Sequence, residues 1–210
     1  MLRRDFSLLV LSACFTGASR AAKPLPATIL VLGDSLSAEY GLQRGEGWVA
    51  LLQARLEQEK IAARVVNASI SGDTTSGGRS RLPALLALHK PTLVIIELGG
   101  NDALRGLPLA MSRDNLQAMA QAAKAGGARV LLLGMQMPPN YGQAYAKQFA
   151  DLFSQVAKSQ QAALVPFLLK GVADGPDALK LFQADRIHPL ASAHPTILNN
   201  VWPTLKKLLG

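Results

Sequence analysis

Five short apolar runs alternate with longer segments of helical period, and this alternation constrains the fold more than any other feature. The runs are ATILVLG (27–33), ARVVNAS (63–69), TLVIIELG (92–99), ARVLLLG (128–134) and AALVPF (162–167). Because they do not alternate apolar with polar residues, they indicate parallel strands covered on both faces. The segments with apolar residues three or four positions apart are 48–60, 80–90, 112–127 and 143–160. The sequence therefore predicts an α/β fold, a three-layer α/β/α sandwich around a five-stranded parallel sheet, with the flavodoxin-like order 2-1-3-4-5 as its commonest arrangement.

Capping residues and prolines predict where some helices begin and end. Ser112 is suited to cap the helix that follows it, and Gly126-Gly127 can end that helix in the left-handed conformation. Pro195 and Pro203 lie in the last helical segment, 190–209, where a proline removes a backbone hydrogen bond. We therefore expect this segment to be a kinked or broken helix.

The first 22 residues have the pattern of an export signal. A basic start (MLRR) precedes a short apolar run (FSLLVLSA) and a stretch of small residues (GASRAA). We expect a signal peptide at 1–22, cleaved near Ala21 or Ala22, and a single domain at 23–210 in the periplasm or outside the cell. Two other leader types stay open: RRDF resembles a twin-arginine signal, and LSAC resembles a lipobox that would anchor a lipoprotein through Cys14.

Composition and charge exclude several classes of function. Hydrophobic residues make up 49% of the chain and charged residues 17%, which favours a globular protein with a sizeable core. The net charge is +8, and +6 without the leader, which carries three arginines and one aspartate. Because lysines and arginines are scattered, we predict no nucleic-acid partner, although a positive surface is compatible with contact at a membrane surface. Three histidines without close His or Cys partners predict no metal site, and no phosphate-binding glycine motif follows a strand, so we expect no cofactor.

Three polar segments that contain glycine follow the first three predicted strands. They are GDS (33–35), NASISGD (67–73) and GGND (99–102). The carboxyl ends of parallel strands meet at one edge of the sheet, where ligands bind near the reversal of strand order, so we expect these segments to form one site. An isolated GDS would favour a structural interpretation, in which Ser35 only caps the segment after it.

The segment DRIH (185–188) changes this interpretation of Ser35. Residues three apart on a helical turn share a face, so the Asp185 carboxylate can reach one imidazole nitrogen of His188 and direct the other outward. A serine nucleophile requires such a pair of a base and a carboxylate that orients it.

Other polar residues of these segments have structural interpretations. Asp34 lies next to Ser35, and neighbouring side chains usually diverge, so we expect it to stabilise the loop, as we do for Asp73 and Asp102. His194 has no carboxylate three residues away and is not expected to act as a base.

Four separated blocks give the chain a specific resemblance to a known family. The blocks are GDSLS (33–37), NASISGDTT (67–75), ELGGNDALRG (97–106) and DRIHP (185–189). In this order they resemble the SGNH, or GDSL, hydrolase family, and within it the group of bacterial thioesterase I, lysophospholipase L1 and arylesterase. MPPNYG (137–142) is similar to a further segment typical of this group.

The resemblance implies a role for each site residue. Ser35 would be the nucleophile, His188 the base that takes its proton, and Asp185 the carboxylate that holds the imidazole tautomer. The backbone N–H groups of Ser35 and Gly72 and the side-chain amide of Asn101 would form the oxyanion hole. The implied protein is an exported, monomeric serine esterase that hydrolyses small acyl esters, thioesters or lipids through an acyl-serine intermediate, without a metal or cofactor.

The acyl group and the exact reaction stay open at this point. The resemblance implies an apolar acyl groove bordered by 101–107 and 137–142, and Ala103 stands where the group commonly has glycine. Candidates for the lining of this groove are Trp48, Met135, Met137 and Tyr141. A carbohydrate O-acetyl esterase would share the same triad, and a catalytically silent lipid- or glycan-binding domain would keep these residues without activity.

Overall fold

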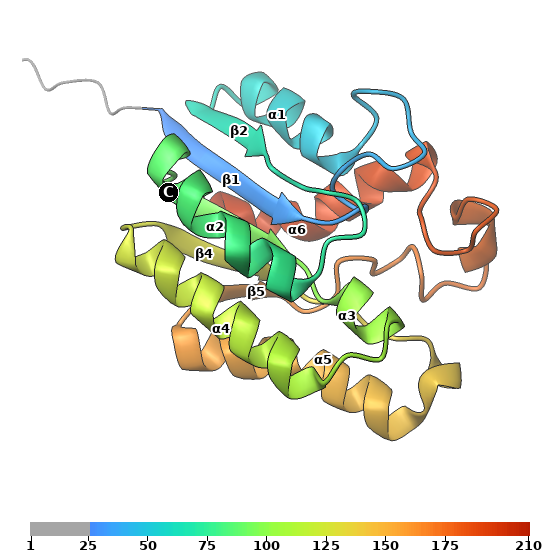
Figure 1. The fold of residues 1–210 in the computed structure, drawn as a ribbon. Helices are drawn as coiled ribbons and strands as arrows, with labels where there is room; N and C mark the ends of the chain where they lie inside the picture. The colour runs from blue at the N-terminus through green and yellow to red at the C-terminus, as the bar shows by residue number, and fades with distance from the viewer. Residues whose placement is uncertain (1–25) are drawn as a thin grey trace, which may run out of the picture.

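A parallel sheet of five strands, in the order β2-β1-β3-β4-β5, forms the centre of the computed structural model, which describes residues 26–210 (Figure 1). Its strands are β1 (Ala27–Gly33), β2 (Ala63–Asn67), β3 (Leu93–Glu97), β4 (Arg129–Leu133) and β5 (Ala163–Val165). The predicted number and order of strands are confirmed. The predicted leader, 1–22, lies outside the described residues and stays a prediction.

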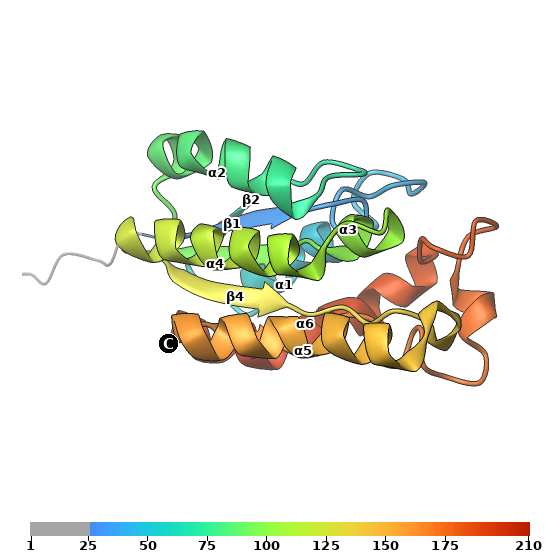
Figure 2. The same cartoon turned by 60° about the horizontal axis from the view of Figure 1, so that its bottom comes forward.

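Helices cover both faces of the sheet, which confirms the three-layer arrangement. The helices are α1 (Trp48–Gln58), α2 (Thr75–His89), α3 (Gly100–Leu104), α4 (Leu109–Ala125), α5 (Gln143–Gln160) and α6 (His194–Leu209), with short 3-10 turns η1 (Pro139–Tyr141), η2 (Ala178–Leu181) and η3 (Ala191–Ala193). α4 packs between α2 and α5 on one face, and α1 packs against α6 on the other. Figure 1 shows α6 behind the sheet with α2 and α4 in front, and Figure 2 shows α2, α4 and α5 as neighbouring rows.

The core lies on the two faces of the central strands. Every residue of β3 is buried, whereas β2, at the edge of the sheet, is only half-buried. The continuous apolar runs therefore describe the central strands better than the edge strand, because only central strands have neighbours on both sides and helices on both faces. Within residues 26–210, no helix has both the length and the hydropathy needed to cross a membrane.

Ser112 does not cap α4 as predicted. The helix begins at Leu109, and the Ser112 hydroxyl instead donates to Asp102 Oδ1 at 3.1 Å inside the protein. Tertiary contact thus overrides the local capping preference. The other end follows the prediction, since Gly127 adopts a left-handed φ of 82° directly after the helix.

The last segment is also less broken than predicted. Pro195 falls in the first turn of α6, where a backbone N–H would have no helical partner to lose. The helix then continues past Pro203 to its end at Leu209. The short 3-10 turn η3 directly precedes α6 and is separate from it in conformation.

β1 and β3 end side by side and β2 ends two residues earlier, which positions the loops that follow them. Val31 pairs with Asn67 on one side and with Ile95 on the other. The three loops therefore leave the sheet at one edge, toward which the arrows point in Figure 1, and α3 and the segment before α6 lie at the same edge.

Candidate active site

Ser35 lies in a tight turn directly after β1, at the carboxyl edge of the sheet. The N–H groups of Ser37 and Ala38 donate to the Asp34 carbonyl at 3.2 and 3.0 Å. The N–H of Tyr40 donates to the Ser35 carbonyl at 3.4 Å. These bonds fix the backbone of the turn and leave the Ser35 side chain half-buried rather than enclosed in the core.

A continuous chain of hydrogen bonds joins Ser35, His188 and Asp185. Ser35 Oγ lies 2.9 Å from His188 Nε2, and His188 Nδ1 lies 2.7 Å from Asp185 Oδ2. When Nδ1 carries the proton and donates it to the carboxylate, Nε2 presents its lone pair to the serine hydroxyl. An imidazole held in this way can take a proton from the hydroxyl as the oxygen attacks a carbonyl carbon.

The segment 185–188 is not the helical turn that its spacing predicted. Asp185 Oδ1 accepts hydrogen bonds from the backbone N–H groups of Ile187 and His188 at 2.9 and 3.0 Å, and Arg186 has a left-handed φ of 59°. An aspartate that accepts from the N–H two residues further on favours this kind of turn over a helix. The contact with the imidazole forms all the same, because the second carboxylate oxygen remains available to it.

The same hydrogen bonds stabilise the ionised form of Asp185. Those from the His188 side chain, the His188 backbone and the Ile187 backbone lower its pKa from 3.8 to about 2. The carboxylate therefore stays charged at every pH at which an esterase is normally assayed, and it can hold the Nδ1 proton throughout.

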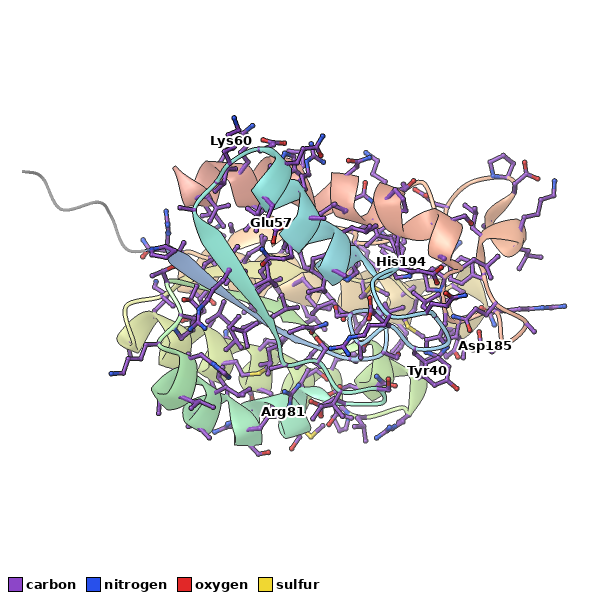
Figure 3. All side chains as sticks on the ribbon, turned by 90° about the horizontal axis from the view of Figure 1, so that it is seen from above. Tyr40, Glu57, Lys60, Arg81, Asp185 and His194 are labelled. Atoms are coloured by element: carbon purple, nitrogen blue, oxygen red, sulfur yellow. The ribbon has the colours of Figure 1, made fainter. Side chains whose placement is uncertain are left out.

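Tyr40 packs against the imidazole of His188, a contact that sequence analysis did not anticipate. The two ring centroids lie 4.2 Å apart with an interplanar angle of 36°, and Figure 3 shows Tyr40 and Asp185 at the same end of the molecule. Gln183 Nε2 donates to the Tyr40 carbonyl at 2.9 Å, which ties the loop after β1 to the segment before α6. No sequence pattern links residues so far apart in the chain.

Of the three oxyanion donors that the resemblance implied, Ser35 and Gly72 lie in the loops after β1 and β2 and Asn101 lies in α3, and their hydrogen bonds differ. Within residues 26–210, the backbone N–H groups of Ser35 and Gly72 donate to no other group. Gly72 has a φ of 78°, a conformation that a residue with a Cβ rarely adopts. The Asn101 amide donates to Asp34 Oδ2 at 3.0 Å and to the Asp73 carbonyl at 2.9 Å. One of these two bonds must open before Asn101 can reach an oxyanion.

Carboxylates fasten these loops together, in agreement with the structural roles predicted for them. Asp102, 0% exposed, accepts from the Thr75 N–H at 2.9 Å and from the hydroxyls of Thr75 and Ser112. Asp73 pairs with Arg81 at 2.8 Å, and the same guanidinium donates to backbone carbonyls at the ends of β1 and β2. The loops after β1, β2 and β3 are thereby held as one unit.

The remaining histidine near this edge has a structural place. His194 is buried, and its Nδ1 accepts a hydrogen bond from the Trp48 N–H at 3.0 Å. Burial lowers the pKa of His194, which favours the neutral imidazole. In the part of the chain that the structure describes, no group of three or more His, Cys, Asp or Glu side chains is arranged to hold a metal ion.

An apolar pocket of about 160 Å³ opens beside the hydrogen-bonded chain. Its lining includes Gly100, the residue before Asn101, and Ile187, the residue before His188, together with Leu104. Its further lining is Met135, Gln136, Met137, Pro138, Phe167, Leu169, Ala173, Phe182 and Arg186. Of the four expected lining residues, only the two methionines take part. Trp48 is instead fully buried, with its indole N–H donating to Ser37 Oγ at 3.2 Å, and Tyr141 lies outside the lining.

Sequence analysis also missed Glu97, although a signal for it was present. Glu97 is a single carboxyl residue within the otherwise apolar run TLVIIELG, and charged residues are almost never fully buried without partners. In the structure it is 1% exposed at the end of β3, behind the Ser35 turn.

Residues 31–194, which include all the site residues named above, match the GDSL-like lipase/acylhydrolase family. The chain belongs to this family. It is similar to esterase TesA of Pseudomonas aeruginosa, to which it is 54% identical over 201 residues. This match covers 96% of the chain and 98% of that protein. It is 40% identical to thioesterase 1/protease 1/lysophospholipase L1 of Escherichia coli strain K12 over 183 residues, 87% of this chain and 85% of that protein. A crystal structure of TesA matches with a TM-score of 0.83 and 57% identity, covering 86% of this chain and 99% of that one, which confirms the GDSL hydrolase fold.

Proposed function

We propose that this protein is a serine esterase that hydrolyses acyl esters and thioesters. The observation that carries the proposal is the chain of contacts from Ser35 Oγ through His188 to Asp185, at 2.9 and 2.7 Å. It places a base within reach of a hydroxyl and a carboxylate behind the base. The similarity to one protein named an esterase and to another named a thioesterase and lysophospholipase supports the same class of reaction.

In the proposed reaction Ser35 Oγ attacks the acyl carbonyl carbon while His188 Nε2 takes the hydroxyl proton. The carbonyl oxygen becomes an oxyanion, which accepts hydrogen bonds from the N–H groups of Ser35 and Gly72 and from the Asn101 amide. The alcohol or thiol then leaves with the proton from His188, and an acyl-serine remains. Water, deprotonated by His188, attacks this ester and releases the carboxylic acid and free Ser35.

We propose that the apolar pocket takes the acyl chain. A cavity of about 150 Å³ lined by apolar side chains holds a benzene molecule, which has six carbons. By that comparison the 160 Å³ pocket holds an acyl group of about six carbons, and the rest of a longer chain would extend toward the exposed side chains of Leu104 and Ile187. An acetyl group would leave most of the pocket empty, so the pocket favours an acyl esterase over a carbohydrate O-acetyl esterase.

We also propose that the protein acts as an exported monomer on small acyl esters or lipids, with contact at a membrane surface when the substrate is a lipid. All groups of the proposed site come from one chain, so the reaction needs no second copy. The basic, apolar and small-residue pattern of 1–22 supports export. The mass of the protein recovered from the producing cells tests whether the leader is removed or Cys14 carries lipid.

A chain-length series tests the proposed activity. We expect the wild-type protein to hydrolyse p-nitrophenyl esters, with kcat/KM highest at about six acyl carbons and lower for acetate. Ser35→Ala should lower kcat for each ester by at least about 10³-fold, because among residues 26–210 no other hydroxyl is hydrogen-bonded to His188. An acetylated sugar in the same series is the control for the deacetylase alternative. Undiminished hydrolysis by Ser35→Ala would contradict the proposal, and so would a clear preference for the acetylated sugar.

A further inference from the structure

We propose that Glu97 is a positioning residue that holds the Ser35 turn and the Asn101 amide in place for catalysis. The inference rests on the proposed function and assigns part of its machinery to a side chain that cannot touch the substrate. Glu97 is 1% exposed and stands at the last position of β3, so it acts only through its neighbours.

One carboxyl oxygen of Glu97 holds the Ser35 turn from both sides. Glu97 Oε2 accepts the backbone N–H of Asp34 at 3.2 Å, directly before the nucleophile, and the Ser37 hydroxyl at 2.8 Å, two residues after it. The Trp48 indole N–H donates to the same hydroxyl at 3.2 Å and fixes its orientation. Ser35 thus lies on a short arch whose two ends are bound to one buried oxygen.

Asp34 extends this control from the turn to the oxyanion hole. Its Oδ1 accepts the Leu36 N–H at 3.0 Å and its Oδ2 accepts the Asn101 amide at 3.0 Å. The N–H of the same residue donates to Glu97 Oε2 at 3.2 Å, so Asp34 is tied both to Glu97 and to Asn101. A displacement of Glu97 therefore moves the Ser35 N–H and the Asn101 amide, two of the three donors proposed for the oxyanion.

The proton of the carboxyl pair belongs on Glu97. Two adjacent buried carboxyls cannot both ionise. Burial and the nearby Asp34 charge raise the pKa of Glu97 well above 4.5. Burial also raises the pKa of Asp34, but only to about 6, because Leu36, the Glu97 side chain, the His188 charge and Asn101 favour its ionised form. The other charged pair at this edge is Arg81 with Asp73. The Arg81 guanidinium donates a hydrogen bond to the carbonyl at the end of β1 and not to Glu97.

Kinetics of three variants test the positioning role. Glu97→Leu keeps the volume but accepts no hydrogen bond, and we expect its kcat to fall about 10²-fold with KM within about threefold of wild type. Glu97→Gln keeps an acceptor oxygen for the Asp34 N–H and the Ser37 hydroxyl, so kcat should return to within about tenfold of wild type. Ile95→Val is the matched control, because Ile95 is buried on the same face of β3 and its apolar side chain cannot accept a hydrogen bond from the turn. Equal loss in Glu97→Leu and Ile95→Val would overturn the proposal, as would unchanged kcat in Glu97→Leu or no recovery in Glu97→Gln.

Thermal unfolding of wild type and Glu97→Gln tests the neutral acid without any assay of activity. The folded chain keeps the Glu97 proton at pH values where the unfolded chain has released it, so this site stabilises wild type less as the pH rises above 4.5. Glutamine has no such proton, and the Tm of Glu97→Gln minus that of wild type should increase from about pH 5 to about pH 8. A constant difference would overturn the neutral acid. Because this measurement needs no substrate, failure of the esterase proposal and failure of this inference are distinguishable.

Discussion

Gly33 ends β1 directly beneath the Ser35 turn, at a position where no side chain has room. A Cβ there would lie 2.8 Å from Glu97 Oε2 and 2.8 Å from Ser37 Oγ. These two atoms are hydrogen-bonded to each other at 2.8 Å, so neither can withdraw without breaking the bond. The glycine of the GDS segment is therefore required by the close approach of two side chains and not by a left-handed backbone.

Gly33→Ala should accordingly lower kcat more strongly than it lowers Tm. The methyl group would push Glu97 and Ser37 apart and shift the turn, and we expect kcat to fall by at least about tenfold, since small displacements of reacting groups are costly. Gly175→Ala is the matched control, because a Cβ at Gly175 meets no atom within 4 Å. Steady-state kinetics and thermal unfolding of both variants test this prediction. Equal kcat values in the two variants would contradict the proposed packing of Gly33 against the turn.

In the turn that carries Asp185 and His188, the sequence spacing predicts the contact between the two side chains but not the backbone conformation. The three-residue separation correctly predicted that the two side chains meet. It also predicted a helical turn, whereas the Asp185 carboxylate accepts two backbone N–H groups and the turn is not helical. The same local competition explains Ser112, whose hydroxyl has a buried carboxylate as partner instead of a helix terminus. Side chains that bind the backbone or a distant carboxylate set these conformations, and such partners are not visible in hydrophobic periodicity.

Asp185→Asn should separate the role of charge from that of shape in this turn. The amide keeps the size of the carboxylate but can present its N–H groups to Nδ1, which favours the wrong imidazole tautomer, and we expect kcat to fall by about 10³- to 10⁴-fold. The pKa of Asp185 in the folded protein is lowered from 3.8 to about 2, so its charge stabilises the fold above pH 3.8. This stabilisation is lost as the pH falls toward 2. Asp185→Asn has no such charge, so its stability should not show this loss.

Asp177→Asn is the control for this variant. Asp177 also pairs with a cation three residues further on, Lys180 at 2.7 Å, but both side chains are exposed and the pair is separate from the hydrogen bonds that join Asp185, His188 and Ser35. Its kcat should equal that of wild type. A loss in Asp177→Asn comparable to that in Asp185→Asn would show that the segment, and not the carboxylate beside His188, determines activity.

Across the whole molecule, the features decided by apolar periodicity could be predicted from the sequence, and those decided by buried polar contacts could not. The bounds of β1 and α5 agree with the prediction to the residue, because both are long and strongly patterned. α2 starts at Thr75, five residues before the predicted segment; the Thr74 hydroxyl accepts the Gly77 N–H there, and Asp102 of α3 accepts the Thr75 N–H. Tyr40 could not be predicted for the same reason, since its partner His188 lies in a distant segment, whereas Glu97 could have been recognised as the single carboxyl residue of its apolar run.

Covalent labelling of the whole protein with a fluorophosphonate tests the central claim, that Ser35 is a nucleophile activated by His188. The reagent phosphonylates a reactive serine and releases fluoride, so intact-mass spectrometry counts the adducts and peptide mapping locates them. The account predicts one adduct, on Ser35, in the wild-type protein and none in Ser35→Ala. An adduct on another residue, or equal labelling of Ser35→Ala, would contradict it.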